Sequence, residues 1–186
     1  MRKLTTLFLK ALPLLFVMLA FTGLKAQTFQ YTVDNVTQVS ANIVQFDLEL
    51  LNLDPATPIE IATIQAGVLI NPATYGGGTI IAQIVPGSST MGFTQIPTSV
   101  AFTQSQNAVK LAPKVPPNCG GGTFMSTDPA DPTILTRIKL TNTQPWNFGE
   151  DPLCLNPTFN FTTTPYPTRI SWYDPVCENV ALPVNA

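Results

Sequence analysis

The segment NIVQFDLELLN, residues 42–52, contains the clearest periodic pattern in the chain. Its apolar side chains occupy every second position and its polar side chains lie between them: Val44, Phe46, Leu48 and Leu50, with Gln45, Asp47 and Glu49. Because successive side chains of a β-strand point to opposite faces, this pattern predicts a strand with one buried face and one solvent-facing face.

The same alternation recurs on both sides of this segment. It is found in 28–33, 58–70, 79–85, 99–104, 108–112, 133–140, 158–162 and 168–174, separated by Pro, Gly and Asn clusters. Within 133–140, Ile134, Thr136, Ile138 and Leu140 share one face. The 58–70 stretch is expected to bend near Gly67. No helical period follows the leader, so the sequence predicts an all-β, two-sheet antiparallel β-sandwich of about nine strands.

The N-terminus has the character of a secretory signal peptide, with a helical apolar core. Arg2 and Lys3 precede an uncharged apolar run over 11–24, and Ala26 supplies the small residue before the cleaved bond. We therefore expect a signal peptide over 1–26, a sandwich over 27–181 and the start of a linker or tail over 182–186. An uncleaved anchor is the alternative. The expected location is extracellular or the outer cell surface, with the periplasm as a further alternative, and no membrane span after cleavage.

Charge and composition exclude several classes of function. Four of the nine basic residues lie in the leader and all eleven acidic residues lie outside it, so the mature chain carries five basic and eleven acidic groups. Nucleic acid is therefore not an expected partner, since phosphate binding needs clustered Lys and Arg. The chain has no histidine, which removes the usual general base. Asp47 and Glu49 share a strand face, which we interpret as a solvated face rather than a glycosidase pair. We expect a protein that is not an enzyme.

Three cysteines, Cys119, Cys154 and Cys177, follow the leader. An exported chain favours a disulfide, and an odd count leaves one thiol over. If 158–162 and 168–173 form a hairpin, its register extends to place Cys154 opposite Cys177. We therefore predict a Cys154–Cys177 disulfide, with Cys119 free or paired between chains.

Two triple-glycine loops, 76–78 and 120–122, are expected to form turns with positive φ rather than phosphate sites, because neither opens a helix. No metal or cofactor is expected. A structural calcium ion is the alternative raised by the loop carboxylates Asp128, Asp131, Glu150, Asp151 and Asp174.

The candidate ligand-binding residues are Trp146, Tyr166 and Tyr173, together with Asp151. Aromatic rings beside Asn and Asp side chains are what a sugar-binding platform needs. Loop aromatics also close the ends of sandwiches, which is the structural alternative for Trp146 and its neighbour Phe148.

The run YTVDNVTQVSANIVQFDLELLNLDPATPIEIATIQAGVLINPATYGGGTI, 31–80, resembles the N-terminal module of proteins exported by type IX secretion systems. The phrases IVPGSS, VKLAP and TRIKLTNT resemble later strands of that module. The resemblance implies a cohesin-like jelly roll related to carbohydrate-binding modules, with a role in adhesion, scaffolding or glycan binding.

The leading hypothesis is thus a non-catalytic secreted or cell-surface interaction module that binds a protein or a glycan. A polysaccharide-binding module and a structural building block of a surface assembly are the two alternatives.

Overall fold

The computed structural model describes residues 29–112, 114–149, 151–162, 164–174 and 176–181. The predicted signal peptide and the predicted tail over 182–186 lie outside these ranges. In the described ranges the chain forms eleven strands and three short 3-10 turns, and every strand pairing is antiparallel. The two-sheet antiparallel sandwich is therefore confirmed, with β7 and β11 in addition to the nine expected strands.

Sheet A has four strands in the order β1-β2-β8-β4. Their bounds are β1 Phe29–Ser40, β2 Ile43–Asn52, β8 Thr133–Asn142 and β4 Ile80–Ile84. The alternation that defines β2 is confirmed, because Val44, Phe46, Leu48 and Leu50 are fully buried against the opposite sheet. Burying such side chains stabilises the fold by about 1.5–3 kcal/mol each.

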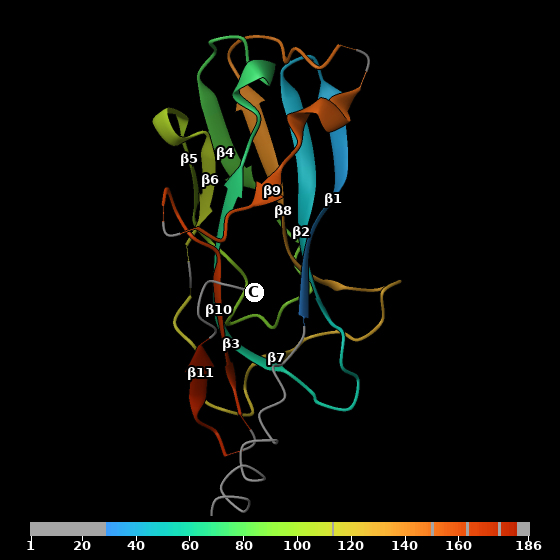
Figure 1. The fold of residues 1–186 in the computed structure, drawn as a ribbon, viewed down its shortest axis with the longest axis vertical. Coiled ribbons are helices and arrows are strands. Elements are labelled where there is room, and N and C mark those ends of the chain that lie inside the picture. The colour runs from blue at the N-terminus through green and yellow to red at the C-terminus, as the bar shows by residue number, and fades with distance from the viewer. Residues whose placement is uncertain (1–28, 113, 150, 163, 175, 182–186) are drawn as a thin grey trace, which may run out of the picture.

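Sheet B has the order β11-β10-β3-β6-β5, and β7 and β9 also pair with β3. The bounds are β3 Glu60–Leu69, β5 Val100–Thr103, β6 Ala108–Leu111, β7 Thr123–Phe124, β9 Thr158–Phe159, β10 Arg169–Tyr173 and β11 Asn179–Ala181. The 3-10 turns are η1 Pro72–Thr74, η2 Gln104–Gln106 and η3 Pro152–Leu155. Figure 1 shows the strands along the long axis of the molecule, with loops gathered beyond both ends.

A β-bulge changes the side-chain phase in β8. Leu48 pairs with Thr136 and the next residue of β2, Glu49, pairs with Ile134, so Leu135 is an extra residue in the ladder. Leu135 is fully buried and Ile134 is only half-buried. The prediction that Ile134 belongs to the same buried row as Ile138 is therefore wrong.

Each flank of β3 is built from two strands laid end to end. On one flank, Phe159 of β9 pairs with Val68, and Arg169 of β10 pairs with Gln65. The two paired positions are ten residues apart in the β9–β10 segment but only three residues apart in β3. Seven residues thus leave the ladder between β9 and β10, which lie one above the other in Figure 1. Another seven leave it between β6 and β7, where Leu111 pairs with Ala66 and Thr123 pairs with Ile61.

The segment between β9 and β10 crosses β3 at Gly67. A Cβ atom on Gly67 would lie 1.7 Å from the carbonyl oxygen of Tyr166. The Thr168 hydroxyl accepts a hydrogen bond from the Gly67 N–H (3.1 Å) and donates one to the Gly67 carbonyl (3.0 Å). Glycine is needed here because the crossing backbone occupies the place of a side chain. The bend expected at Gly67 is instead a close crossing within a continuous strand.

Candidate functional site

One end of the sandwich, which we call the closed end, is sealed by aromatic side chains. Trp146 is 6% exposed, stacks on Phe148 with ring centroids 5.5 Å apart and meets Tyr75 edge-on. The Trp146 indole N–H donates a 3.0 Å hydrogen bond to the carbonyl of Asn42. The Tyr75 hydroxyl donates a hydrogen bond to Asn107. These contacts join the four connections at this end, 41–42, 70–79, 104–107 and 143–157.

The other end, which we call the loop end, leaves apolar side chains exposed. Strand direction places five connections there: 53–59, 85–99, those joining β6 to β7 and β7 to β8, and the turn between β10 and β11. Five of the seven exposed large apolar residues of the described chain lie in these connections or on β7: Leu53, Phe93, Val115, Phe124 and Val176. Exposed apolar side chains gathered in one region mark interaction surfaces.

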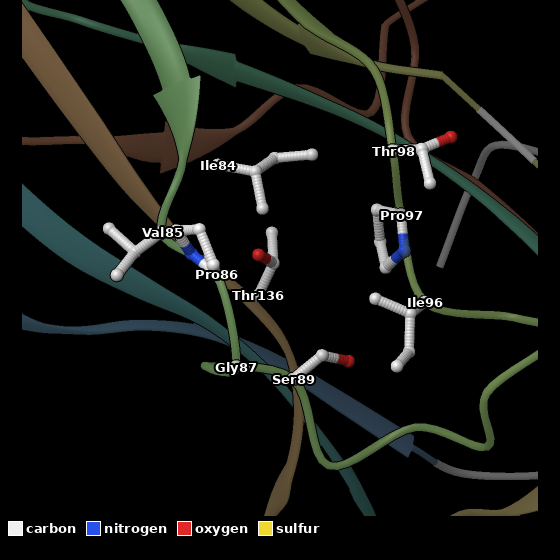
Figure 2. Close-up of a pocket in the computed structure, with 9 residues that line it drawn as sticks. All are labelled: Ile84, Val85, Pro86, Gly87, Ser89, Ile96, Pro97, Thr98 and Thr136. Atoms are coloured by element: carbon white, nitrogen blue, oxygen red, sulfur yellow. The ribbon is translucent and has the colours of Figure 1, made fainter.

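An apolar cleft of about 380 Å³ opens beside the loop end. Its walls are the segments Ile84–Gly87 with Ser89 and Ile96–Thr98, and Thr136 of β8 lies between them. Figure 2 shows the side chains of Ile84 and Ile96 pointing into the gap. None of the nine lining residues is charged, and their polar side chains are the hydroxyls of Ser89, Thr98 and Thr136. A cleft of this size and character fits an apolar group of a partner.

The cleft lies beside β4, an edge strand of sheet A, on the side of the sandwich where β5 is the edge strand of sheet B. Among the described strands, β4 pairs only with β8 and β5 pairs only with β6. Thr79 accepts a bond from Thr143, and Val85 donates one to Arg137. Since peptide groups alternate in direction along a strand, those of Ala82 and Ile84 point away from β8. The edge beside the cleft therefore has donors and acceptors without a partner strand in the described chain, and β5 of the other sheet lies alongside it.

The second triple-glycine loop encloses an internal carboxylate. Glu60 is 6% exposed, and its two carboxylate oxygens accept hydrogen bonds from the N–H groups of Gly120 (3.0 Å) and Gly122 (2.6 Å). Gly120 has a φ of 81°, as expected of a turn glycine. Successive N–H groups in such loops form anion-binding nests, and here the anion belongs to the chain itself.

The predicted Cys154–Cys177 disulfide is wrong. Cys119 and Cys177 form the bond, with Cα atoms 5.5 Å apart, and Cys154 is free and exposed. The hairpin that led to the error does not exist, because β9 and β10 both run antiparallel to β3 and follow one another along it. The disulfide instead ties the connection after β6 to the turn after β10, and so braces the loop end.

The Asp47 carboxylate is not on a solvated face, contrary to expectation. It is 1% exposed and receives two 2.7 Å hydrogen bonds from Arg137 and one of 2.9 Å from Asn35. The bond to Asp47 raises the pKa of Arg137. Burial raises the pKa of Glu49, and the negative charges of Asp34 and Asp47 raise it further. This polar group stabilises the outer face of sheet A.

The four residues predicted to bind a ligand do not share a surface. Trp146 is buried in the closed end, and Asp151 is exposed beside it in sequence. Tyr166 crosses β3 at Gly67, with the Lys110 ammonium 5.5 Å from its ring centroid. The Tyr173 hydroxyl donates to the carbonyl of Pro117, and Tyr173 pairs with Glu60 at the other end of β3. Nothing in the structure brings them together as a platform.

The described ranges contain no group of three or more His, Cys, Asp or Glu residues placed to hold a metal ion. Nor does any helix in these ranges have the length and apolar character needed to cross a membrane.

No family model matches the chain, and no curated protein matches its sequence. Among solved structures, the chain is similar to one in the crystal structure of a Coh3ScaB–XDoc_M1ScaA complex, an N-terminal interface mutant of a type II cohesin–X-dockerin complex from Acetivibrio cellulolyticus. The identity is 10%, the match covers 83% of this chain and 91% of that chain, and the TM-score is 0.39. A likeness at this TM-score carries no conclusion about this chain.

The cleft and the exposed loop-end residues were not among the residues predicted from sequence. The cleft is assembled from 84–89, 96–98 and Thr136, which share no motif. The available signal was the long connection 85–99, which is free of charge and contains Phe93 and Ile96.

Proposed function

We propose that this protein is a non-catalytic interaction module, secreted or held at the cell surface, that takes an extended segment of a protein partner into the cleft beside β4. The apolar cleft next to an unpaired strand edge carries this proposal. An extended segment that pairs with the peptide groups of Ala82 and Ile84 would place its alternate side chains toward Ile84, Ile96 and Pro97. Backbone pairing supplies affinity in this mode of recognition, and side-chain pockets supply specificity.

The placement of the aromatic residues favours this proposal over a polysaccharide-binding platform. The ring of Trp146 is enclosed by Phe148 and Tyr75, so its face is not available to a sugar. The hydroxyl groups of Tyr166 and Tyr173 donate to carbonyls of their own chain. Export and attachment to the cell surface by a type IX system remain part of the proposal, and the resemblance of 31–80 to that class supports them.

Selection of displayed random peptides on the immobilised chain tests the proposal. We expect the selected peptides to be apolar at alternate positions. Their affinity should fall at least about tenfold in Ile84→Lys, since that substitution places a charge in the cleft. Ile81→Lys is the matched control, because Ile81 lies on the same strand and is exposed outside the cleft. Equal binding to both variants would show that the cleft is not the site.

A further inference from the structure

Two phenylalanine rings stand exposed on neighbouring segments of the loop end. Phe93 is 90% exposed and Phe124 is 59% exposed. Their segments are joined by a 2.8 Å hydrogen bond from the Gly92 N–H to the Thr123 hydroxyl, so each ring lies one residue from the same contact. Leu53 directly follows Asn52 at the end of β2, and the Asn52 N–H donates to the carbonyl of Ser126, two residues after Phe124. The two rings and Leu53 form what we call the phenylalanine patch.

The backbone that carries these rings is firmly held. Gln95 is 4% exposed, and its amide donates to the carbonyls of Ile61 (2.7 Å) and Ala62 (3.1 Å) while accepting from the N–H of Thr123 (2.6 Å). On the other side of Phe124, the Met125 N–H donates to Ile59. The two rings are therefore exposed although the backbone segments that carry them are held in place by hydrogen bonds. Large side chains held ready on fixed backbone bind partners with little loss of conformational entropy.

The surroundings of the patch are acidic. The loop-end connections contain one basic residue, Lys114, and five acidic residues. The acidic residues are Asp54, Asp128, Asp131, Asp174 and Glu178. None of the five carboxylates belongs to a salt bridge in the described part of the chain. The Asn52 N–H donates to Ser126, and this bond holds the connection containing Asp54 beside the one containing Asp128.

We propose that the phenylalanine patch is a docking surface for a cationic polypeptide segment in which Lys or Arg residues are interspersed with apolar residues. Charge complementarity selects this partner. Apolar side chains of the segment would pack on Phe93 and Phe124, and its cations would lie near Asp54, Asp128 and Asp131. The acidic rim disfavours anionic partners, since like charges across an interface are repulsive and opposite charges speed association. The patch lies outside the cleft, so this inference goes beyond the proposed function.

Titration of the purified chain with three synthetic peptides tests the inference. The first peptide repeats Lys-Phe-Ser, the second repeats Glu-Phe-Ser and the third repeats Lys-Ser-Ser. We expect the first to bind most tightly and to weaken steeply as sodium chloride is raised, because salt screens exposed charges. Backbone amide shifts in two-dimensional NMR should change at 91–95 and 123–131. Equal affinity of the first two peptides, or of the first and third, would overturn the proposal.

Paired variants identify the groups responsible. Phe93→Ser combined with Phe124→Ser should weaken the Lys-Phe-Ser peptide at least about tenfold, while Ile81→Ser, an exposed apolar residue of sheet A, should leave its affinity unchanged. Asp128→Asn combined with Asp131→Asn should weaken binding and reduce its salt dependence. Asp34→Asn, which removes one negative charge from the outer face of sheet A, should do neither. Shifts centred on sheet A would contradict the assignment.

Two further results separate this inference from others. Calcium chloride alone should not shift 123–131, and a saturable calcium response there would assign the carboxylates to a metal ion instead. The Ile84→Lys variant should bind the Lys-Phe-Ser peptide as the unchanged chain does. Loss of binding in that variant would place the peptide in the cleft and overturn the patch, leaving the proposed function intact.

Discussion

The two ends of the sandwich use their apolar side chains in opposite ways. At the closed end, Trp146, Phe148 and Tyr75 are buried and pack on one another. At the loop end, Phe93 and Phe124 face solvent although the segments beneath them are hydrogen-bonded. The buried cluster has a sufficient explanation in stability. The exposed rings contribute little to the fold, so their position is better explained by recognition.

Truncation of one aromatic residue at each end gives the largest contrast. Trp146→Ala should reduce the free energy of unfolding by about 3–5 kcal/mol, because it empties a packed site and removes the hydrogen bond to Asn42. Phe93→Ala should change it by less than about 0.5 kcal/mol. Urea denaturation of both variants checks the difference. A comparable loss in Phe93→Ala would show that the exposed ring is part of the core after all.

Removal of the disulfide shows how far the loop end depends on covalent bracing. Cys119→Ser should cost about 2–4 kcal/mol, since the bond closes a loop between residues 58 positions apart. Cys154→Ser is the matched control and should have little effect, because Cys154 is free and exposed. Denaturation under non-reducing conditions measures both. If the control were the more damaging substitution, the observed pairing would be refuted.

The smallest expected effect concerns Glu49, a carboxylate on sheet A that is 8% exposed. The folded state raises the pKa of Glu49, so the folded chain holds its proton more tightly and stability falls as pH rises through that pKa. Glu49→Gln should therefore stabilise the fold at neutral pH by a few tenths of a kcal/mol. The gain should vanish below about pH 4, where the unfolded chain is also protonated. Denaturation curves recorded across this range measure the gain, and a gain that did not change with pH would contradict the prediction.

Much of the fold follows from the sequence because side-chain alternation is a local property. Val44 through Leu50 are buried as their pattern predicts. The bulge at Leu135 could not be read in this way, since it depends on the register with β2. The false hairpin has a similar cause. Two strands close in sequence can pair with each other or with a common third strand, and the alternation of 158–162 and 168–173 is the same in both cases.

The candidate site was less predictable than the fold. Trp146 lies in a polar loop, yet the structure buries it, because Asn42 and Tyr75 reach it from distant parts of the sequence. The cleft depends on how 84–89, 96–98 and Thr136 meet in space. Sequence spacing carries no record of such contacts. The expectation that the chain is not an enzyme rests on composition, because a histidine-free acidic β-domain offers little for general acid–base chemistry.

The interrupted partners of β3 have a consequence for how the chain acquires its structure. Glu60 pairs with Tyr173 and Leu69 pairs with Thr158, so sheet B joins residues about one hundred positions apart. Long-range pairing of this kind has high contact order and forms slowly. During synthesis, β3 cannot obtain its second flank until nearly the whole sandwich has been made. The polypeptide is therefore expected to stay unfolded until most of it has been synthesised. An unfolded chain is the form that crosses a membrane, which agrees with the export that the predicted signal peptide implies.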